Sequence, residues 1–311
     1  MTTVAPVTAA STLPRRRRAD GLRRLLARTD GLIGVAILVI FGLLALAPTL
    51  FVGPLQDVVT ATGLPLDPPS AAALLGTDEL GRDMVNITVH GARISMSIGL
   101  MATIITILLG TVVGIVAGYV GGVTDALLMR FSDFLLVLPT VVLALILAPV
   151  LDAVVGEGAE LFGIRSTLLI VVVVIGLTSW PSCARVIRSQ VLSLKERMFV
   201  DRARVVGSGP GWIMRRHILP NVVNLVVAQA VLTFASAVFT ETTLAFIGLG
   251  DPAAPSWGQV LNAAQTAGAP GLGAWWYVLP PAACVVLVVL AFTLVGNALD
   301  DVLNPRARGR R

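Results

Sequence analysis

The longest charged stretch of the chain lies between two apolar runs and reads Gln190-Val-Leu-Ser-Leu-Lys-Glu-Arg-Met-Phe-Val-Asp-Arg-Ala-Arg-Val-Val-Gly-Ser-Gly-Pro-Gly-Trp-Ile-Met-Arg-Arg-His-Ile-Leu-Pro-Asn221. Its residues 193–206 have a helix-forming composition, and Gly207 follows where glycine commonly ends a helix. Pro210 suits the first turn of a second helix, which we expect to end at Pro220. A helix–glycine–helix that is basic on one side and apolar on the other either docks into a groove of a soluble partner or lies on anionic lipid.

The composition of the whole chain is that of a membrane protein. Of the 311 residues, 56% are hydrophobic and 13% are charged, and the mean hydropathy of +0.87 excludes an ordinary soluble domain. Cys183 and Cys284 fall in different apolar segments, so we expect no structural disulfide. The sequence has neither a G-x-x-x-x-G-K nucleotide loop nor a His/Cys cluster with metal-ligand spacing. We therefore expect no catalytic, cofactor or metal site, and any ATP to be bound by another chain.

Apolar segments of the chain are long enough to cross about 30 Å of hydrocarbon at about 1.5 Å per residue. Six such segments are present, at 31–52, 95–119, 127–151, 167–187, 222–248 and 277–299. They lack the two-residue alternation of barrel strands, which favours helices. Asp133 and Pro139 interrupt the third segment near its start. The sequence thus predicts an all-α integral membrane protein with six transmembrane helices.

The distribution of basic residues predicts the orientation of these helices. The arm 1–30 carries seven arginines, and although such an arm can bind nucleic acid, the positive-inside rule explains it directly before a first membrane span. If the N-terminus is cytoplasmic and all six segments cross, the exceptions among the 23 lysines and arginines are Arg82, Arg93 and Arg165, and the others face the cytoplasm. This orientation makes 53–94 an extracytoplasmic loop, and it makes 190–221 and the tail 306–311 cytoplasmic.

Several motifs carry a resemblance to a known family. Asp201-Arg-Ala203, then Gly207, then His217-Ile-Leu-Pro220 resembles the EAA loop of ABC importer permeases, and the ending His-Ile-Leu-Pro-Asn is similar to the dipeptide/oligopeptide/nickel branch. Further matches to this branch are Gly-Thr-Asp-x-x-Gly-Arg-Asp at 76–83, the segment 240–250 and Pro-Ser-Trp-Gly at 255–258. Two departures are the Asp-Arg that replaces Glu-Ala at 201–202 and the Gly-Pro-Gly at 209–211, where the branch usually has a polar helix cap.

The resemblance implies a C-type permease subunit with a type I ABC importer fold, in which a five-helix core spans 95–305 and a cytoplasmic coupling helix contacts the ATPase. It implies these partners: a homologous B-type permease, two ABC ATPase subunits that bind the ATP and magnesium, an extracytoplasmic solute-binding protein, and the lipid of a prokaryotic plasma membrane, with no nucleic acid. It assigns the ATPase-coupling role to Asp201, Ala203, Gly207, His217, Ile218, Leu219 and Pro220. Such a chain is a transporter subunit and not an enzyme.

The outer loop holds a cluster of charged residues. Asp78, Glu79 and Asp83 lie close together in the sequence, but the glycine spacing does not fit a calcium-binding EF-hand loop. By the resemblance, these acids and Arg82 are candidates for docking the solute-binding protein. The alternative is a self-capped loop in which the acids bind backbone N–H groups and Arg82.

The fifth apolar segment carries a polar stripe. Gln229, Thr233, Ser236, Thr240 and Thr243 recur at steps of 4, 3, 4 and 3, so at 100° per residue they lie within a stripe roughly 80° wide. Polar side chains at membrane depth avoid lipid, so the stripe is a candidate pore lining. Its alternative is helix packing, and the family context of the nearby Glu241 indicates packing or a gate.

Two smaller features concern how the helices pack. Glycines recur every four residues at Gly110, Gly114, Gly118 and Gly122, which permits close approach of a neighbouring helix. Asp133 lies three residues after Arg130, and we expect the two to form a buried ion pair at the inner boundary.

Two other classes of function fit the sequence less well. An ion-coupled secondary transporter should show paired interrupted helices and an inverted repeat, which the sequence does not display. An intramembrane hydrolase needs a nucleophile and a base at membrane depth, yet His90 and His217 lie at or beyond the predicted boundaries. The sequence leaves the substrate open among dipeptides, longer peptides, nickel chelates and related solutes.

Overall fold

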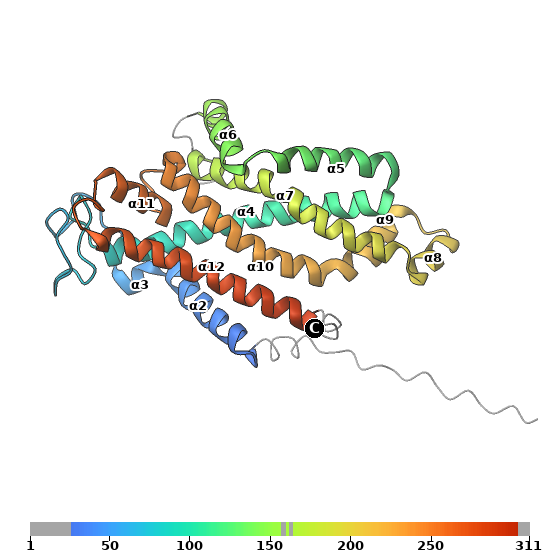
Figure 1. Ribbon diagram of the computed structural model, residues 1–311, viewed down its shortest axis with the longest axis horizontal. Helices are drawn as coiled ribbons and strands as arrows, with labels where there is room; N and C mark the ends of the chain where they lie inside the picture. The colour runs from blue at the N-terminus through green and yellow to red at the C-terminus, as the bar shows by residue number, and fades with distance from the viewer. Residues whose placement is uncertain (1–25, 157–159, 162–163, 304–311) are drawn as a thin grey trace, which may run out of the picture.

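The computed structural model describes residues 26–156, 160–161 and 164–303. The tail predicted at 306–311 and most of the arm predicted at 1–30 lie outside these residues. Long helices run side by side along the molecule (Figure 1). One end carries the loop before α4 together with α11, and we call it the loop end. The opposite end carries α8 and α9, and we call it the hairpin end.

In the described part of the chain, the regular elements are helices and one short β-hairpin. In order, the elements are α2 (Thr29–Leu46), α3 (Pro48–Val52), α4 (Met84–Val120), α5 (Gly122–Val137), α6 (Thr140–Val155), β1 (Glu160–Leu161), β2 (Ile164–Arg165), α7 (Ser166–Lys195), α8 (Met198–Val205), α9 (Pro210–Ile213), the π-helix η1 (Met214–Ile218), α10 (Leu219–Leu244), the π-helix η2 (Ala245–Leu249), α11 (Trp257–Thr266) and α12 (Trp275–Leu303). The strands β1 and β2 pair antiparallel. The predicted all-α class is confirmed.

Among the described residues, five helical stretches are long and apolar enough to span a membrane, and the pair α5–α6 passes the same criterion when its two arms are taken together. These arms are bent by 95°, so the third predicted segment, 127–151, is not one continuous helix. The bend occurs at Pro139, since proline disfavours helical geometry in the residue before it and Leu138 is extended, with φ −76° and ψ 128°. The chain is thus a multi-pass membrane protein with one sharply bent helix pair.

Two other boundaries differ from the prediction. The first span is not continuous over 31–52, because Pro48 has no N–H to extend α2 and Ala47 before it leaves the helix. The second helix begins at Met84 rather than near 95, since the carboxylate of Asp83 accepts the N–H of Val85 at 2.7 Å and caps it. The predicted outer loop 53–94 therefore ends in about three turns of helix.

The helices α4 and α7 run parallel from the loop end to the hairpin end and form the most extensive helix pair, and glycines set their separation. A Cβ on Gly110 would lie 2.6 Å from Cβ of Cys183, and one on Gly114 would lie 2.6 Å from the carbonyl oxygen of Ala184. Gly118 similarly faces Val191, so the predicted packing role of these glycines is confirmed. The predicted packing role is wrong for Gly122, which has φ +58° and begins α5 with open space around it.

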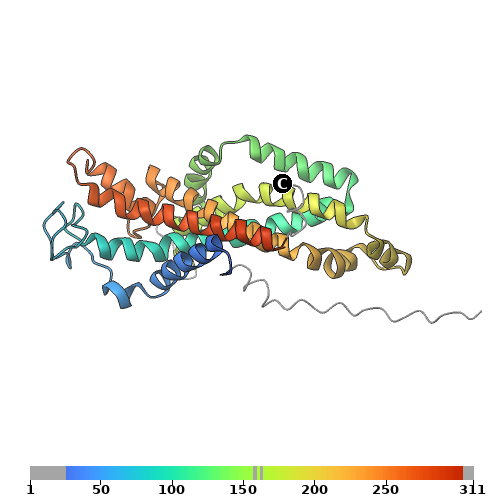
Figure 2. The same cartoon turned by 60° about the horizontal axis from the view of Figure 1, so that its bottom comes forward.

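The remaining helices build outward from this pair. α10 packs against α4 and α12, and α12 packs against α2 (Figures 1 and 2). Stacked rings of Phe234 and Phe292, 4.1 Å apart, join α10 to α12. On the other side, α5 runs alongside α7 and α6 crosses above the bundle. α7 and α10 thus both pack against α4, and a polar cavity lies between them.

Candidate functional site

The α8–α9 hairpin, residues 198–213, closes the hairpin end of the bundle. Gly207 follows α8 with φ +86°, and its N–H donates to the carbonyl of Arg204 at 2.9 Å. The N–H of Ser208 donates to the carbonyl of Ala203 at 3.0 Å. These two bonds form a Schellman cap, which needs the left-handed conformation that glycine adopts readily. Pro210 occupies the first turn of α9, as predicted.

The helix predicted over 193–206 is two helices in the structure. α7 continues to Lys195, the backbone breaks at Glu196 and Arg197, and α8 begins at Met198. The end of α8 is at the predicted glycine, whereas its beginning is five residues later. A composition favourable to helix does not show the break, because Glu196 and Arg197 themselves have ordinary helix propensities.

The prediction that Pro220 ends the second helix is wrong. α9 passes through the π-turn η1 directly into α10, so residues 210–249 form one helical stretch. Within it the N–H of Leu219 donates to the carbonyl of Met214, five residues back. Proline cannot donate to such a ladder but is tolerated where the register changes at a π-turn. The hairpin is consequently continuous with the helix that carries the polar stripe.

The residues expected to contact an ATPase divide into two groups. Ala203 and Ile218 are buried in a cluster with Val200 and Ile213, which holds α8 against the start of α10. His217 lies between the rings of Phe199 and Trp212, at centroid distances of 5.9 and 5.0 Å. The others, Asp201, Gly207, Leu219 and Pro220, are exposed. The buried group builds the hairpin, and the exposed group is available to a partner.

Apolar side chains are also displayed on this hairpin. Val205 and Val206 are 87% and 85% exposed, Met198 is 70% exposed, and Trp212 is 52% exposed. Basic groups stand beside them at Arg215 and Arg216, both exposed. Large apolar side chains with a polar rim are typical of a protein interface.

A cavity of about 270 Å³ lies between α7, α10 and the bend between α5 and α6. We call it the polar cavity. From the predicted stripe, Gln229, Thr233, Ser236 and Thr240 line it, while Thr243 does not. Leu136 and Thr140 line it from the bend. Four of the five stripe residues therefore line one wall of this cavity, which is open to the outside at Ser236.

The opposite wall of the polar cavity escaped the sequence analysis. It is formed by Thr178, Ser179 and Ser182 of α7. The available signal was the i, i+4 spacing of Thr178 and Ser182 on an otherwise apolar helix. Hydroxyls on both walls donate back to their own helices, as Thr178 does to Val174 at 2.9 Å and Thr240 to Ser236 at 2.8 Å. Their oxygen lone pairs are left for water or a solute in the cavity.

Two ion pairs fasten α5 to α7 beside the polar cavity. Asp125 accepts from Nε and Nη2 of Arg188, both at 2.5 Å. Asp133 accepts from Arg185 at 2.6 Å, so the expected pair with Arg130 is wrong, and the side chains of Asp133 and Arg185 are exposed rather than buried. Proximity in sequence favoured Arg130, but the two helices bring the arginine of α7 closer.

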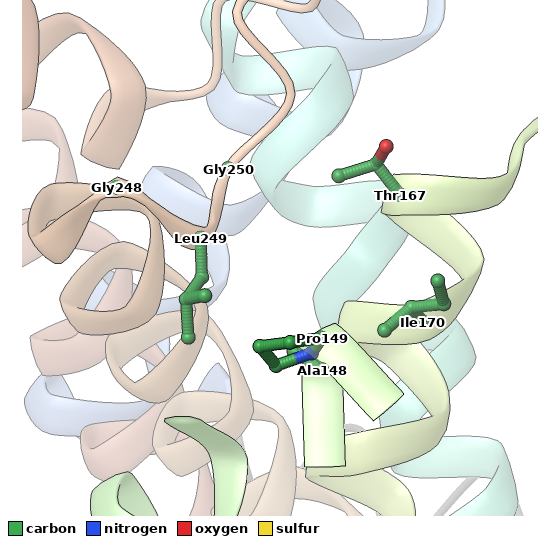
Figure 3. A pocket seen from close by; sticks show the side chains of 7 residues that line it. All are labelled: Ala148, Pro149, Thr167, Ile170, Gly248, Leu249 and Gly250. Carbon is green, nitrogen blue, oxygen red and sulfur yellow. The ribbon is translucent and has the colours of Figure 1, made fainter. Parts of the chain in front are cut away.

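A second cavity lies nearer the loop end, between α6, α7 and η2 (Figure 3). We call it the end pocket; its volume is about 210 Å³. Leu249 approaches from η2, opposite Thr167 and Ile170 of α7, with Pro149 of α6 below them. Gly248, with φ +96°, turns the backbone out of the helix at this point.

An apolar barrier separates the two cavities. Ala144 of α6, Val174 of α7 and Leu244 of α10 each lie between the residues that line the polar cavity and those that line the end pocket. All three are at most 1% exposed and belong to one core cluster.

The charged residues at the loop end are used by the fold. Asp78 is fully buried, and its carboxylate accepts from the N–H groups of Leu80 and Arg82 at 2.9 and 2.8 Å and from Nε of Arg82 at 2.6 Å. Asp83 caps α4. These contacts match the self-capped alternative, in which the acids bind backbone and Arg82. Glu79 is half-buried and accepts the hydroxyl of Tyr277; its burial raises the pKa of its carboxyl above the usual range.

Glu241 lies apart from the polar cavity. Its side chain is 1% exposed and interacts with the hydroxyls of Ser95, Thr242 and Ser256. The hydroxyl of Ser95 also accepts the N–H of Trp257 at 3.1 Å. Glu241 therefore joins α10 to α4 and to the start of α11, which agrees with the packing interpretation.

Comparison with known proteins gives a consistent picture. Residues 110–309 match the family described as binding-protein-dependent transport system inner membrane component. A Brucella suis protein named as a peptide permease is 37% identical over 280 residues, covering 86% of this chain and 87% of that protein. The dipeptide transport system permease protein DppC of Bacillus subtilis is 34% identical over 296 residues, covering 93% of this chain and 86% of that protein. The chain belongs to the family of inner membrane components of binding-protein-dependent transport systems.

Proposed function

We propose that this chain is the permease subunit of an ATP-driven importer of dipeptides or oligopeptides and forms one half of its translocation pathway. The observation that carries the proposal is the polar cavity, which hydroxyl and amide side chains line on two facing helices. Peptides present amide, amino and carboxyl groups that such side chains bind without fixing the peptide sequence. The relatives named as peptide permeases support the same class of substrate.

A second permease subunit completes the pathway. The cavity of this chain alone is small for a peptide, at about 270 Å³, and Ser236 in its wall is exposed. An exposed polar residue at membrane depth requires a protein or water neighbour, since lipid cannot satisfy it. A homologous subunit that places its own polar stripe opposite this one meets that requirement.

The α8–α9 hairpin transmits the free energy of ATP hydrolysis from partner ATPase subunits, which hold the nucleotide and magnesium. Its apolar side chains and arginines are exposed for docking. Since residues 210–249 are one helical stretch, a displacement of the hairpin moves the polar stripe and Leu244 of the apolar barrier with it. Import then requires the barrier to open toward the loop end when the hairpins are driven together.

The loop end faces outward and receives the solute-binding protein. Positive residues favour the cytoplasmic side, and the described arginines and lysine of the α8–α9 hairpin and its flanks lie at the hairpin end. Cysteines introduced at Ser70 and Gly268 should therefore react with an impermeant thiol reagent added to intact cells, and one at Ser208 should not. Reaction of the Ser208 cysteine from outside would overturn this orientation.

The test of the function is uptake by the assembled transporter. The chain, its partner permease, the ATPases and the binding protein are reconstituted in vesicles with ATP, and labelled dipeptide, pentapeptide and nickel chelate are compared as substrates. We expect peptide uptake that requires ATP and the binding protein. Uptake of the nickel chelate but of neither peptide would contradict the proposed substrate class, and peptide uptake that persists without ATP would contradict the mechanism.

A further inference from the structure

A groove of about 410 Å³ lies between α4 and α7 near the loop end. Arg93, Ser97 and Met101 line it from α4, and Leu168, Leu169 and Val172 line it from α7. Met101 lies about 160° around α4 from Gly99, and Gly99 faces Val238 of α10. The groove is therefore on the flank of the bundle that is turned away from α10 and the polar cavity.

The polar end of this groove holds an unpaired cation. Within the described part of the chain, Arg82 and Arg165 at the same end form ion pairs with Asp78 and Asp251. The side chain of Arg93 is exposed and has no ion pair or hydrogen bond with any described residue. Ser97 follows one turn later on the same face, and its hydroxyl likewise has no hydrogen bond to a described residue.

The apolar end of the groove continues into a surface suited to hydrocarbon. Along α4, Ile104, Leu108 and Val112 are exposed in succession beyond Met101. From Arg93 to Met101 the helix rises about 12 Å, so the cation lies at one boundary of the apolar surface rather than in its middle. An arginine in this position extends its charge to the headgroup level of a bilayer and keeps its stem in the apolar groove.

We propose that this groove is a binding site for one phospholipid, whose phosphate contacts Arg93 and Ser97 and one of whose acyl chains lies along Met101, Leu168 and Val172. A guanidinium group matches the geometry of phosphate oxygens, and a hydroxyl adds one more donor. The site favours a lipid with net negative charge, since a zwitterionic headgroup places its own cation near Arg93. This inference is independent of the substrate proposed above.

Native mass spectrometry of the purified transporter complex tests the site. Phosphatidylglycerol or phosphatidylcholine is added to the delipidated complex, and bound lipids are counted as a function of lipid concentration. Arg93→Gln removes the charge but keeps the length of the side chain, and Met101→Trp fills the groove but keeps Arg93. Arg165→Gln is the matched control, because it removes one positive charge at the same end and does not line the groove.

The wild-type complex should bind one phosphatidylglycerol more tightly than phosphatidylcholine. Arg93→Gln should weaken this binding about fivefold, as expected for one basic residue against an anionic headgroup, while Arg165→Gln should leave it unchanged. Met101→Trp should also lose the bound lipid. As a second readout, phosphatidylglycerol should raise the thermal unfolding temperature of the wild-type complex and not that of Arg93→Gln.

Three results would overturn the proposal. Equal binding of both lipids to the wild type would mean that only bulk lipid covers the groove. Equal binding by wild type and Arg93→Gln would exclude the phosphate contact. Loss in Arg93→Gln without loss in Met101→Trp would mean that Arg93 binds an acidic group elsewhere, such as a carboxylate of a partner subunit, and that no acyl chain occupies the groove.

Discussion

The two ends of the bundle use their charged side chains in opposite ways. At the loop end, Asp78 and Asp83 bind backbone N–H groups, and Asp78 also binds Arg82. At the hairpin end, Asp201 and Arg204 form an ion pair at 3.1 Å whose two side chains are exposed, next to exposed valines. Both clusters look alike in sequence, as short runs of acids and bases near glycines. The difference shows that similar charged motifs are built into the fold at one end and remain accessible to a partner at the other.

The largest effect expected from this difference is on stability. Asp78→Asn replaces a fully buried carboxylate by a neutral amide. The guanidinium group of Arg82 then loses the negative charge with which it is paired. We expect a loss of about 3 kcal/mol, the magnitude typical of a broken buried ion pair. The same substitution at the exposed Asp201 should change the stability by less than about 0.5 kcal/mol.

The unfolding temperatures of the two purified variant complexes provide the comparison. A large fall for Asp78→Asn with little change for Asp201→Asn is the expected pattern. Similar changes in unfolding temperature for both variants would mean that the hydrogen bonds and ion pair of Asp78 do not stabilise the fold more than the exposed Asp201 does.

A second expected effect concerns the polar cavity between the two ends. Ser236→Trp places a large ring in a cavity of about 270 Å³ and should reduce uptake by more than tenfold while the complex still assembles. Leu108→Trp is the matched control, because Leu108 is exposed on α4 and does not line the cavity. Normal uptake by Ser236→Trp would move the pathway to another part of the molecule.

A small effect is expected at Glu79. Burial raises the pKa of this carboxyl above its ordinary value of 4.5, so the folded protein holds the proton more tightly than the unfolded chain. Stability should therefore fall as the pH rises from about 4.5 through the folded-state pKa and should level off above it. In Glu79→Gln this part of the pH dependence should disappear, and its persistence would assign the titration to another group.

Features that depend on local geometry could be predicted from the sequence. The cap at Gly207 and Pro210, the close contacts of Gly110 and Gly114, and the polar stripe each follow from spacing along one helix. The long apolar segments likewise predict an integral membrane protein.

Features that depend on distant partners could not be predicted. Asp133 and Arg185, which pair across α5 and α7, are 52 residues apart in the chain. The hydroxyl residues of α7 can be recognised as a cavity wall only once α10 is known to lie opposite them. The sharp bend at Leu138 and the continuation of the helix through Pro220 are both proline effects. Their outcomes differ because a π-turn precedes Pro220, whereas Leu138 is extended.

The central claim is that the α8–α9 hairpin couples the ATPases to the pathway, and a pair of glycine variants tests it most directly. Gly207 and Gly273 have φ of +86° and +73°, and neither has an atom within 4 Å of an added Cβ. Valine strains both positions similarly, because a β-branched residue adopts positive φ poorly. The two glycines differ in their location, at the hairpin end and the loop end.

The measurement is co-purification of the ATPases with each variant, together with ATP-driven uptake. Gly207→Val should misplace α9 and weaken ATPase binding roughly thirtyfold, which corresponds to about 2 kcal/mol for a lost interface hot spot, and uptake should be lost with it. Gly273→Val should retain the ATPases at the wild-type level. Full ATPase retention and full uptake in Gly207→Val would contradict the account.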